Sequence, residues 1–351
     1  MKSLTIIKLD GIGDYILFRN FLISLHHNGY KITLIGNDLW RSLAEHYDNS
    51  IIDKFIWINI NDFIANRFYR KWIQLRISMF SCEMVFSPTF SRRYYIEDHI
   101  AKWMRARMKI APEDDCTNKT PTTDNESKKI YSQLIKVPED IHFEFDRYQS
   151  LLDTFLSGCS QSVHRPSLPS GSIHIDINSR YVVLVPGANE SFRKWPIERF
   201  SQLANYIASQ FNLKLVVCGS QSEKNLGDFI VNKSENKDRV MNLCGKTSLV
   251  DYCAIIQNAE FTIGNDSSAI HIAAATNTTA ICISNGNHFG RFNPYPQNIS
   301  KDIHYIYPFN PINSYNNYMV KYRKGSNLDI SLVELGKVTA LFDRLASDLN
   351  A

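Results

Sequence analysis

Three short segments of the sequence contain residue types that can bind a phosphate group or transfer a proton. They are "DGIGDY" (10–15), "PGANESFRKWPIERF" (186–200) and "GNDSSAIH" (264–271), and each is preceded by or begins in a run of aliphatic and β-branched residues. Such runs are typical of buried strands in a parallel sheet, so each segment is expected in a loop at the carboxyl end of a strand. Loops in that position often carry the functional residues of open α/β proteins.

The first segment has the Gly-x-Gly spacing that opens a dinucleotide-binding fingerprint, in Gly11 and Gly13. The third small residue of that fingerprint is replaced by Ile16, so a Rossmann cofactor loop is only weakly indicated. Asp14 is expected near the N-terminus of the next helix, where a carboxylate can accept backbone N–H bonds. It could instead take a proton from a substrate as a general base. The residues leave capping and catalysis open for Asp14, and also for Asp10.

The second segment offers a turn and a cation. Gly187 permits a tight turn close to a ligand. Lys194 precedes the pair Trp195 and Pro196, which fixes where the next helix begins. A lysine held just beyond a strand can neutralise phosphate charge, although a surface lysine before a helix would have the same sequence.

The third segment predicts an anion site at the start of a helix. Asp266 is expected to cap that helix, and the backbone N–H groups of Ser267 and Ser268 would be free to bind an anion. His271 follows Asp266 by five residues, about one and a half helical turns, so the two side chains need not share a face. A histidine buried in the core is the alternative for His271.

Length and composition indicate a folded protein of two domains. The chain has 351 residues, and single domains commonly have ~150 residues. No run approaches the ~20 apolar residues of a membrane helix, and the N-terminus lacks the pattern of a signal peptide, so a cytoplasmic location is expected. The cysteines are scattered without CxxC pairs and are interpreted as small core residues, with no metal site: Cys82, Cys116, Cys159, Cys218, Cys244, Cys253 and Cys282.

Basic residues are concentrated in the N-terminal half of the chain, although the net charge is only +4. Two clusters, "RFYRKWIQLR" (67–76) and "WMRARMK" (103–109), are interleaved with Trp and Tyr. Such clusters could contact anionic lipid, a phosphorylated glycan or nucleic acid, and the alternative is a solvated helix face.

Strand-like and helical runs alternate in the first half of the chain, which predicts a parallel sheet covered by helices on both faces. Residues 111–135 are polar and are predicted to form a long loop. Residues 157–172, rich in Ser, Pro and Gly, are the predicted domain boundary. The predicted strands are 3–9, 31–36, 55–60 and 83–88, and the predicted helices are 14–27, 38–47, 62–79 and 146–156.

The same alternation begins again after the boundary and predicts a second doubly wound domain. The expected domains are residues 1–160 and 175–328, with a C-terminal helix in 329–351 that packs back across both. Two open α/β domains would bring the carboxyl ends of their strands to one central cleft. The predicted strands are 181–187, 213–220, 240–245, 260–266 and 279–286, and the predicted helices are 196–211, 222–231, 248–259 and 267–276.

Four segments in chain order resemble glycosyltransferase family 9, the ADP-heptose:lipopolysaccharide heptosyltransferases and their relatives. They are "KLDGIGDYILF", "VPGANESFRKWPIERF", "NLCGKTSLVDYCAIIQNAEFTIGNDSSAIHIAAA" and "CISNGNHFGRFNPY". The likeness covers residues 1–60 and 180–296 well and is poor over 80–175. It implies an α/β GT-B fold of two Rossmann-like domains, the first for the acceptor and the second for the donor nucleotide. It also implies inverting transfer without a metal ion, and the chain has no DxD motif between these loops.

The resemblance gives the candidate residues their roles. Asp14 falls on the aspartate proposed in the family as the general base that deprotonates the acceptor hydroxyl. The departing nucleoside diphosphate needs positive charge, which Lys194 and the helix start at Ser267 can supply. The chain departs from the family in "DSSA" and in "ANES", which affects the contact assigned to Asn189. The donor-binding residues that the resemblance implies are Gly187, Asn189, Lys194, Glu223, Asp266, Ser267, Ser268 and His271.

The resemblance is least informative about the acceptor. "FSRRYYIEDHIAKWMRARMK" (90–109) lies where relatives bind acceptors, and Arg92 and Arg93 are the candidates within it. The leading hypothesis is heptose transfer from ADP-heptose, a substrate rather than a cofactor, to a hydroxyl of lipopolysaccharide or another surface glycan. A hexose nucleotide stays open as the donor. The expected site of action is the cytoplasmic face of the inner membrane, with peripheral membrane contact and no nucleic-acid partner.

Two other classes of function compete with this hypothesis. One is a GT-B-like sugar-nucleotide epimerase or hydrolase, in which Asp14 would serve a different proton transfer. The other is a catalytically silent glycan-binding protein, against which the joint presence of Asp14, Lys194, Asp266 and His271 argues.

Overall fold

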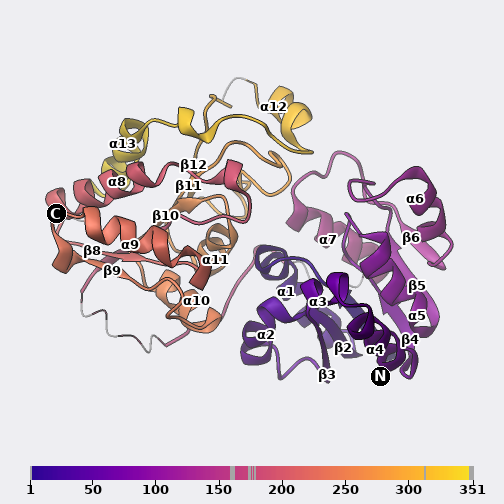
Figure 1. Cartoon of the computed structure of the whole chain (residues 1–351). Helices are drawn as coiled ribbons and strands as arrows, with labels where there is room; N and C mark the ends of the chain where they lie inside the picture. The colour runs from indigo at the N-terminus through magenta and orange to yellow at the C-terminus, as the bar shows by residue number, and fades with distance from the viewer. Residues whose placement is uncertain are drawn as a thin grey trace. The chain divides into compact units, whose positions relative to one another are not determined.

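The chain folds into two compact units, residues 1–166 and 167–351. The computed structural model describes residues 2–158, 163–172, 175, 177, 179–311 and 314–347. Each unit contains one six-stranded parallel sheet with helices on both faces (Figure 1). The predicted fold class, two Rossmann-like doubly wound domains, is therefore confirmed. Residues 159–162 of the predicted boundary, Cys159 among them, and residues 348–351 of the predicted C-terminal helix lie outside the described residues.

Unit 1 has the sheet order β3-β2-β1-β4-β5-β6. Helices α1 and α7 pack together on one face, where Phe18 and Tyr148 meet edge to face. On the other face Ile73 and Ile77 of α4 reach Ile7 and Ile35 of the sheet. The elements are β1 (Lys2–Lys8), α1 (Ile12–His27), β2 (Tyr30–Asn37), η1 (Asp38–Trp40), α2 (Arg41–Tyr47), β3 (Lys54–Ile58), α3 (Ile60–Ala65), α4 (Arg67–Ser78), β4 (Ser81–Phe86), η2 (Tyr94–Asp98), α5 (His99–Trp103), β5 (Arg105–Pro112), α6 (Pro121–Lys128), β6 (Gln133–Ile135) and α7 (Glu144–Phe155).

Unit 2 has the sheet order β12-β11-β10-β7-β8-β9. Its main core joins the sheet to α8, α9 and α13, with Leu203, Ile230 and Phe342 from the three helices. The C-terminal helix α13 thus packs on unit 2, beside α8. The elements are β7 (Tyr181–Val185), η3 (Ser191–Arg193), α8 (Ile197–Gln210), β8 (Lys214–Val217), η4 (Gln221–Glu223), α9 (Lys224–Lys233), η5 (Lys237–Arg239), β9 (Val240–Asn242), α10 (Leu249–Gln257), β10 (Phe261–Asn265), α11 (Ser268–Thr276), β11 (Ala280–Ile283), β12 (Ile303–Ile306), α12 (Tyr315–Tyr322), η6 (Ile330–Leu332) and α13 (Leu335–Leu345).

The two sheets have the same strand order when each unit is numbered from its own first strand. In both, the first strand lies beside the fourth, so the chain winds outward in opposite directions from that pair. Ligands of doubly wound sheets bind at such a switch point, beyond the carboxyl ends of the two strands. The switch points lie between β1 and β4 in unit 1 and between β7 and β10 in unit 2.

The prediction of one long loop over residues 111–135 is wrong. Strand β5 continues to Pro112, and helix α6 and strand β6 follow it. The Thr120 hydroxyl caps α6 by accepting the N–H of Thr123, and Pro121 occupies the first turn. These are ordinary helix start signals, hidden within a polar composition.

Three further segments differ from their predicted structure. The basic cluster 103–109 lies mostly in strand β5 rather than on a helix face. The predicted helix 62–79 is divided at Asn66, whose side chain accepts the N–H groups of Phe68 and Tyr69 and starts α4. Strand β12 and helix α12 were not expected, because their short aromatic runs have no clear periodicity.

Most of the described cysteines lie in the protein interior, as predicted. Cys218, Cys244, Cys253 and Cys282 are buried free thiols, whereas the interpretation as a core residue is wrong for Cys116, which is exposed. None of the helices within the described ranges combines the length and the apolar character needed to cross a membrane.

Candidate active site

Asp14 lies in the first turn of α1, just beyond the carboxyl end of β1. Its carboxylate accepts the backbone N–H of Gly11 at 3.2 Å, while Gly11 has the extended backbone of a helix N-cap. The capping role considered for Asp14 is therefore present in the fold. The side chain is still partly exposed, so the carboxylate can both hold the start of the helix and be reached by a substrate.

Asp10, two residues beyond β1, is held by side chains from the end of β1 and from the loop after β4. It accepts the Lys8 ammonium at 2.8 Å and the Thr89 hydroxyl at 3.0 Å. Lys8 is itself buried and donates to the Tyr148 hydroxyl of α7 at 2.6 Å. Asp10 therefore ties the loop after β1 to the loop after β4, which gives it a positioning role beside Asp14.

Arg93 and Arg92 differ in their surroundings. The Arg93 guanidinium is 35% exposed and pairs with Glu97, which is buried. Burial lowers the pKa of Arg93, but the charges of Glu97, Asp10 and Asp14 raise it above its usual value. Arg93 is thus a cation within electrostatic reach of both aspartates at the switch point of unit 1.

Arg92 is enclosed in a buried cluster of four charged side chains. Its guanidinium bonds Asp98 at 3.1 Å and lies 3.4 Å from Asp114. The Lys119 ammonium contacts the same two carboxylates at 2.9 and 2.7 Å. Tyr131 donates its hydroxyl to Asp98 at 2.8 Å. Of the two predicted acceptor residues, Arg93 is therefore accessible, whereas Arg92 is used inside unit 1.

Lys194 lies in a turn that is anchored to the switch point of unit 2. The backbone N–H of Trp195 donates to the Asn265 side chain at 3.0 Å, and the Trp195 indole donates to the Val333 carbonyl at 2.8 Å. Asn265, the last residue of β10, also donates to the Pro186 carbonyl after β7 at 2.7 Å. This bridging amide fixes Lys194 beside the ends of both strands. The Lys194 side chain is partly exposed and forms no ion pair among the described residues.

Asp266 is buried and fully engaged by the protein. Its carboxylate accepts the Asn293 amide at 2.9 Å and the Ser284 hydroxyl at 3.4 Å, and pairs with Arg193 at 3.2 Å. Arg193 also donates to the Asp266 carbonyl oxygen. Asp266 therefore joins the Lys194 turn to the loop after β11, and it acts on the site through these partners.

The start of α11 presents Ser267 as N-cap and Ser268 as the first helical residue. The Ser267 hydroxyl caps no helix N–H and has no hydrogen-bond partner among the described residues, although the atom is buried. The backbone N–H groups at this helix start carry the positive end of the helix dipole. The arrangement is suited to an anion.

His271 lies one turn into α11 and is buried. Its Nδ1 atom is 2.8 Å from the Tyr295 hydroxyl. Burial lowers the pKa of His271 to about 4, with smaller opposite effects from Asp266 and Arg193, so the imidazole is neutral near pH 7. The structure thus combines the two alternatives from the sequence: His271 is a core histidine, and it lies close to Asp266.

Gly187 and Glu223 lie in contact although they come from different loops. A Cβ atom on Gly187 would lie 1.6 Å from Oε1 of Glu223, so any larger residue there would have to displace the Glu223 carboxylate. The other carboxylate oxygen of Glu223 accepts the Ser220 backbone N–H at 2.6 Å. Asn189, in the same turn as Gly187, is exposed.

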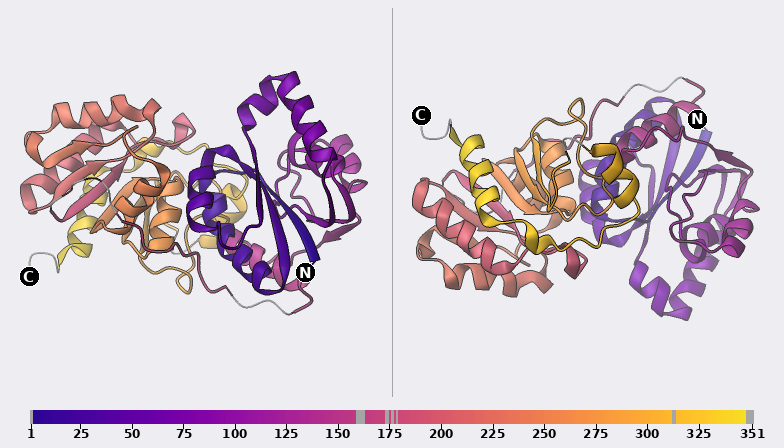
Figure 2. Two further views of the ribbon diagram at one scale, coloured as in Figure 1. Left: turned by 90° about the horizontal axis from the view of Figure 1, so that it is seen from below. Right: turned by 90° about the horizontal axis from the view of Figure 1, so that it is seen from above.

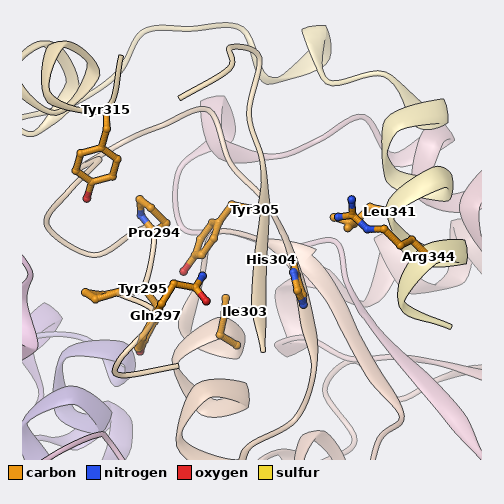
Figure 3. Close-up of a pocket in the computed structure, with 10 residues that line it drawn as sticks. Pro294, Tyr295, Gln297, Ile303, His304, Tyr305, Tyr315, Leu341 and Arg344 are labelled. Carbon is orange, nitrogen blue, oxygen red and sulfur yellow. The ribbon is translucent and has the colours of Figure 1, made fainter. Parts of the chain in front are cut away.

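A pocket of about 460 Å³ lies elsewhere in unit 2 (Figure 3). It is lined by Tyr305 and His304 of β12, by Arg344 of α13 and by the segment around Tyr295. Tyr295 is the residue that links this pocket to His271, and the pocket contains none of the predicted donor-binding residues. We do not assign it to the active site. Within the described residues, no group of three or more His, Cys, Asp or Glu side chains is arranged to hold a metal ion.

Several residues that organise the site were not among the sequence candidates. Lys8 and Thr89 carried no signal, because their role depends on a contact between loops that are distant in the chain. Arg193 and Asn265 are adjacent in sequence to Lys194 and Asp266, so the quoted motifs already contained them. Asn293 could not be found without the fold of its loop.

The sequence comparisons match part of the chain, mostly its second half, to one family. Residues 141–308 match the model of glycosyltransferase family 9 (heptosyltransferase). Lipopolysaccharide heptosyltransferase 3 of Escherichia coli K12 is 29% identical over 126 residues, 36% of this chain and 36% of that protein. The chain thus aligns with about a third of the length of the curated relatives it matches.

The structural comparisons extend over both units. A family 9 glycosyltransferase from Veillonella parvula superposes with a TM-score of 0.75 at 15% identity, over 99% of this chain and 98% of that one. An E. coli heptosyltransferase, WaaC with ADP-2-deoxy-2-fluoro heptose, superposes with a TM-score of 0.71 at 13% identity, over 97% and 99%. At these identities the likeness shows the fold.

In fold, the chain is a GT-B protein built from two Rossmann-like domains. The predicted resemblance to glycosyltransferase family 9 is confirmed, and residues 141–308 carry it. The family model and the curated relatives are both described as heptosyltransferases.

Proposed function

We propose that the chain transfers a sugar, most simply heptose, from a nucleoside diphosphate donor such as ADP-heptose to a hydroxyl of lipopolysaccharide or another surface glycan. This proposal is carried by one observation, the kinds of functional group that lie at the two switch points. The one in unit 1 has a reachable carboxylate, and the one in unit 2 has a cation and a helix start suited to diphosphate. A substrate-binding carboxylate and a diphosphate site are the two requirements of direct sugar transfer.

The proposed reaction is a single displacement with inversion. The Asp14 carboxylate takes the proton of the acceptor hydroxyl, and that oxygen forms a bond to the anomeric carbon of the sugar. The bond between the anomeric carbon and the diphosphate oxygen breaks, and the nucleoside diphosphate leaves with the electron pair. The Lys194 ammonium and the N–H groups at the start of α11 stabilise the charge on that leaving group, without a metal ion.

The roles of the remaining candidates are supported by their contacts. Asp266 and neutral His271 are both buried. They would therefore hold the donor-binding residues in place from the protein interior and would not themselves contact the donor with a charge. Glu223 lies against the Gly187 turn and is offered as the contact to the ribose. Arg93 is offered as a contact to the acceptor, because it lies near enough to Asp14 for their charges to interact.

The proposed place of action is the cytoplasmic face of the inner membrane, where a lipid-linked acceptor is available. The curated relatives are named for transfer to lipopolysaccharide and lipooligosaccharide. The family model matches from residue 141 onward, which corrects the expected poor likeness for residues 141–175, and the acceptor is to be identified by experiment.

The test is a transfer assay with a panel of donors and acceptors. Thermal shift with ADP-heptose, ADP, and UDP- or GDP-hexoses should first identify the donor, since a ligand at ~100 times its Kd adds roughly 2.7 kcal/mol of stability. Mass spectrometry should then find the sugar on a truncated lipopolysaccharide acceptor and free nucleoside diphosphate in equal amount.

The same assay separates the competing functions. An epimerase or a hydrolase would convert the donor when the acceptor is left out, and either result would refute the transfer proposal. A glycan-binding protein without activity would bind the acceptor and leave every donor unchanged.

A further inference from the structure

Helix α4 presents an apolar stripe to the surface of unit 1. Phe68, Trp72, Leu75 and Met79 have exposed fractions of 79%, 51%, 56% and 83%. At about 100° per residue, these four positions fall within an arc of about 60° on one side of the helix. The stripe is continued by Ile64 of α3, which is 56% exposed.

The opposite side of α4 is the side that packs on unit 1. Ile73 and Ile77 are fully buried there, in the core that they share with the sheet. The exposed stripe is therefore additional to the residues that fold the unit. In Figure 2 the α3–α4 segment stands out from the body of unit 1 in both views. An apolar stripe of this size on a solvent-facing helix needs a partner to cover it.

The stripe is bordered by the positive charges of Arg67, Lys71 and Arg76. At about 100° per residue, Arg70 falls on the opposite side of α4. Arg67, Arg70, Lys71 and Arg76 lie in α4, which contains no acidic residue. Their charge of +4 equals the net charge of the whole chain. The Arg76 guanidinium lies over the Trp72 ring, 5.3 Å from its centroid, so the cation and the aromatic ring are presented together. No ion pair between described residues neutralises these four side chains.

We propose that α4 docks unit 1 on a bilayer surface that contains anionic phospholipid. Phe68, Trp72, Leu75 and Met79 would enter the boundary between headgroups and acyl chains, and the flanking Arg and Lys side chains would contact lipid phosphates. A helix with a Trp-containing apolar face and a basic polar face is the type that lies in the membrane interface. Each basic residue near an anionic surface adds attraction that salt can screen.

A lipid surface fits these features better than another macromolecule does. A nucleic acid would use the basic side chains but would leave Leu75 and Met79 in water. A second copy of this helix would bring its +4 charge against another +4 charge, which opposes a symmetric dimer through this face. The inference gives a physical basis to the membrane location in the proposed function, yet it concerns binding alone and needs no substrate.

The experiment is sedimentation of the full chain with vesicles, without donor or acceptor. Vesicles of phosphatidylcholine with phosphatidylglycerol should retain the protein, and vesicles of phosphatidylcholine alone should retain much less. The variant Arg67→Glu/Lys71→Glu should bind the anionic vesicles at least about tenfold more weakly. The matched control is Lys233→Glu/Lys237→Glu, the same change of charge at two exposed lysines of unit 2.

A second measurement locates the contact on α4. Anionic vesicles with brominated acyl chains should quench the tryptophan fluorescence of the chain, and Trp72→Phe should remove most of that quenching while binding persists. The pair Phe68→Ser/Leu75→Ser should weaken binding, whereas Val320→Ser, at a residue 82% exposed in unit 2, should not.

Three outcomes would overturn the proposal. They are equal binding to neutral and anionic vesicles, undiminished binding by the Arg67→Glu/Lys71→Glu variant, and concentration-dependent self-association abolished by Phe68→Ser/Leu75→Ser in the absence of vesicle binding. A failure of sugar transfer with intact vesicle binding would instead count against the proposed function only.

Discussion

The two units share a strand order but have different residues at its switch point. At the switch point of unit 1, Asp10 pairs with the Lys8 ammonium, and Asp14 accepts the backbone N–H of Gly11. At the equivalent point of unit 2, the Asn265 amide bridges neighbouring backbone, and Lys194 is left unpaired among the described residues. The comparison shows that the scaffold fixes where a functional loop begins, while the loop residues decide whether the place suits a proton or a phosphate.

The units also differ in how far their sequence is shared with relatives. The family match covers residues 141–308, which is most of unit 2 and only the end of unit 1. The structural likeness covers nearly the whole chain. The fold of unit 1 is therefore matched by known structures, although the family model covers only the end of its sequence. A donor shared with the relatives and an acceptor particular to this chain would explain why the family match lies mostly in unit 2.

The largest effect is expected from Asp14→Asn in unit 1. Asparagine keeps a side-chain oxygen for the Gly11 N–H, so α1 should stay capped, but it cannot take a proton. The rate of transfer should fall by about 10²- to 10⁴-fold while the donor Kd is unchanged. Steady-state transfer rates and donor titration calorimetry measure the two quantities. Asp140→Asn, at an exposed carboxylate of the same unit, should leave both unchanged. Normal turnover by the Asp14 variant would remove Asp14 from the mechanism.

The next effect tests the phosphate side of the comparison. Lys194→Met should weaken donor and nucleoside diphosphate binding by about 10- to 100-fold, the value of a hydrogen bond to a charged group. Acceptor binding should not change. Calorimetric titration with ADP against the control Lys233→Met measures the effect, and equal affinities for the two variants would show that Lys194 is a surface lysine.

A smaller effect is expected from Gly187→Ala, which tests packing at the donor turn. The new methyl group would displace the Glu223 carboxylate from its place and destabilise unit 2 by about 1–3 kcal/mol. In a Glu223→Ala background the methyl group meets no carboxylate, so Gly187→Ala should then cost little. Urea unfolding of the four proteins gives the coupling. An equal loss in both backgrounds would mean that Glu223 is not the obstacle.

The smallest effect concerns the pH dependence of unit 2. Burial lowers the pKa of His271 from 6.5 to about 4. Between these values the unfolded chain binds a proton that the folded chain does not, so the free energy of unfolding falls as the pH is lowered. The part of this loss that comes from His271 between about pH 7 and pH 5.5 should be on the order of 1 kcal/mol. His271→Gln should remove that part and leave the contributions of His288 and His304, whose pKa values burial also lowers. Hydrogen exchange of β10 and α11 peptides at both pH values measures it. The same pH slope in both proteins would contradict the assignment.

The sequence predicted those features that depend on local periodicity. The alternation of apolar runs was sufficient for two parallel sheets, and Gly29, which has a φ of +79° just after α1, is a helix stop signal that the sequence displays. The region of residues 111–135 was mispredicted because α6 is polar and β6 has only three residues, so neither has a periodic apolar pattern. Short edge elements gain their stability from tertiary contacts that a single sequence does not display.

A residue of the candidate site was predictable where its position depends only on the short motif that contains it. Lys194 and the start of α11 lie beside the strand ends where the motifs indicated. Arg92 could not be told from Arg93, because what separates them is the position of Asp98, Asp114 and Lys119 in the fold. The distinction between adjacent arginines is a property of burial and not of residue type.

The buried cluster around Arg92 makes residues 87–131 a single block for protein engineering. Its two cations and two anions come from the loop after β4, the end of η2 and the loop between β5 and α6. Removing one member would leave a charge buried without its partner, which is far more costly than exchanging all four. A chimera that seeks another acceptor preference should therefore transplant residues 87–131 together, since a graft that ends inside this stretch would divide an electrically neutral set.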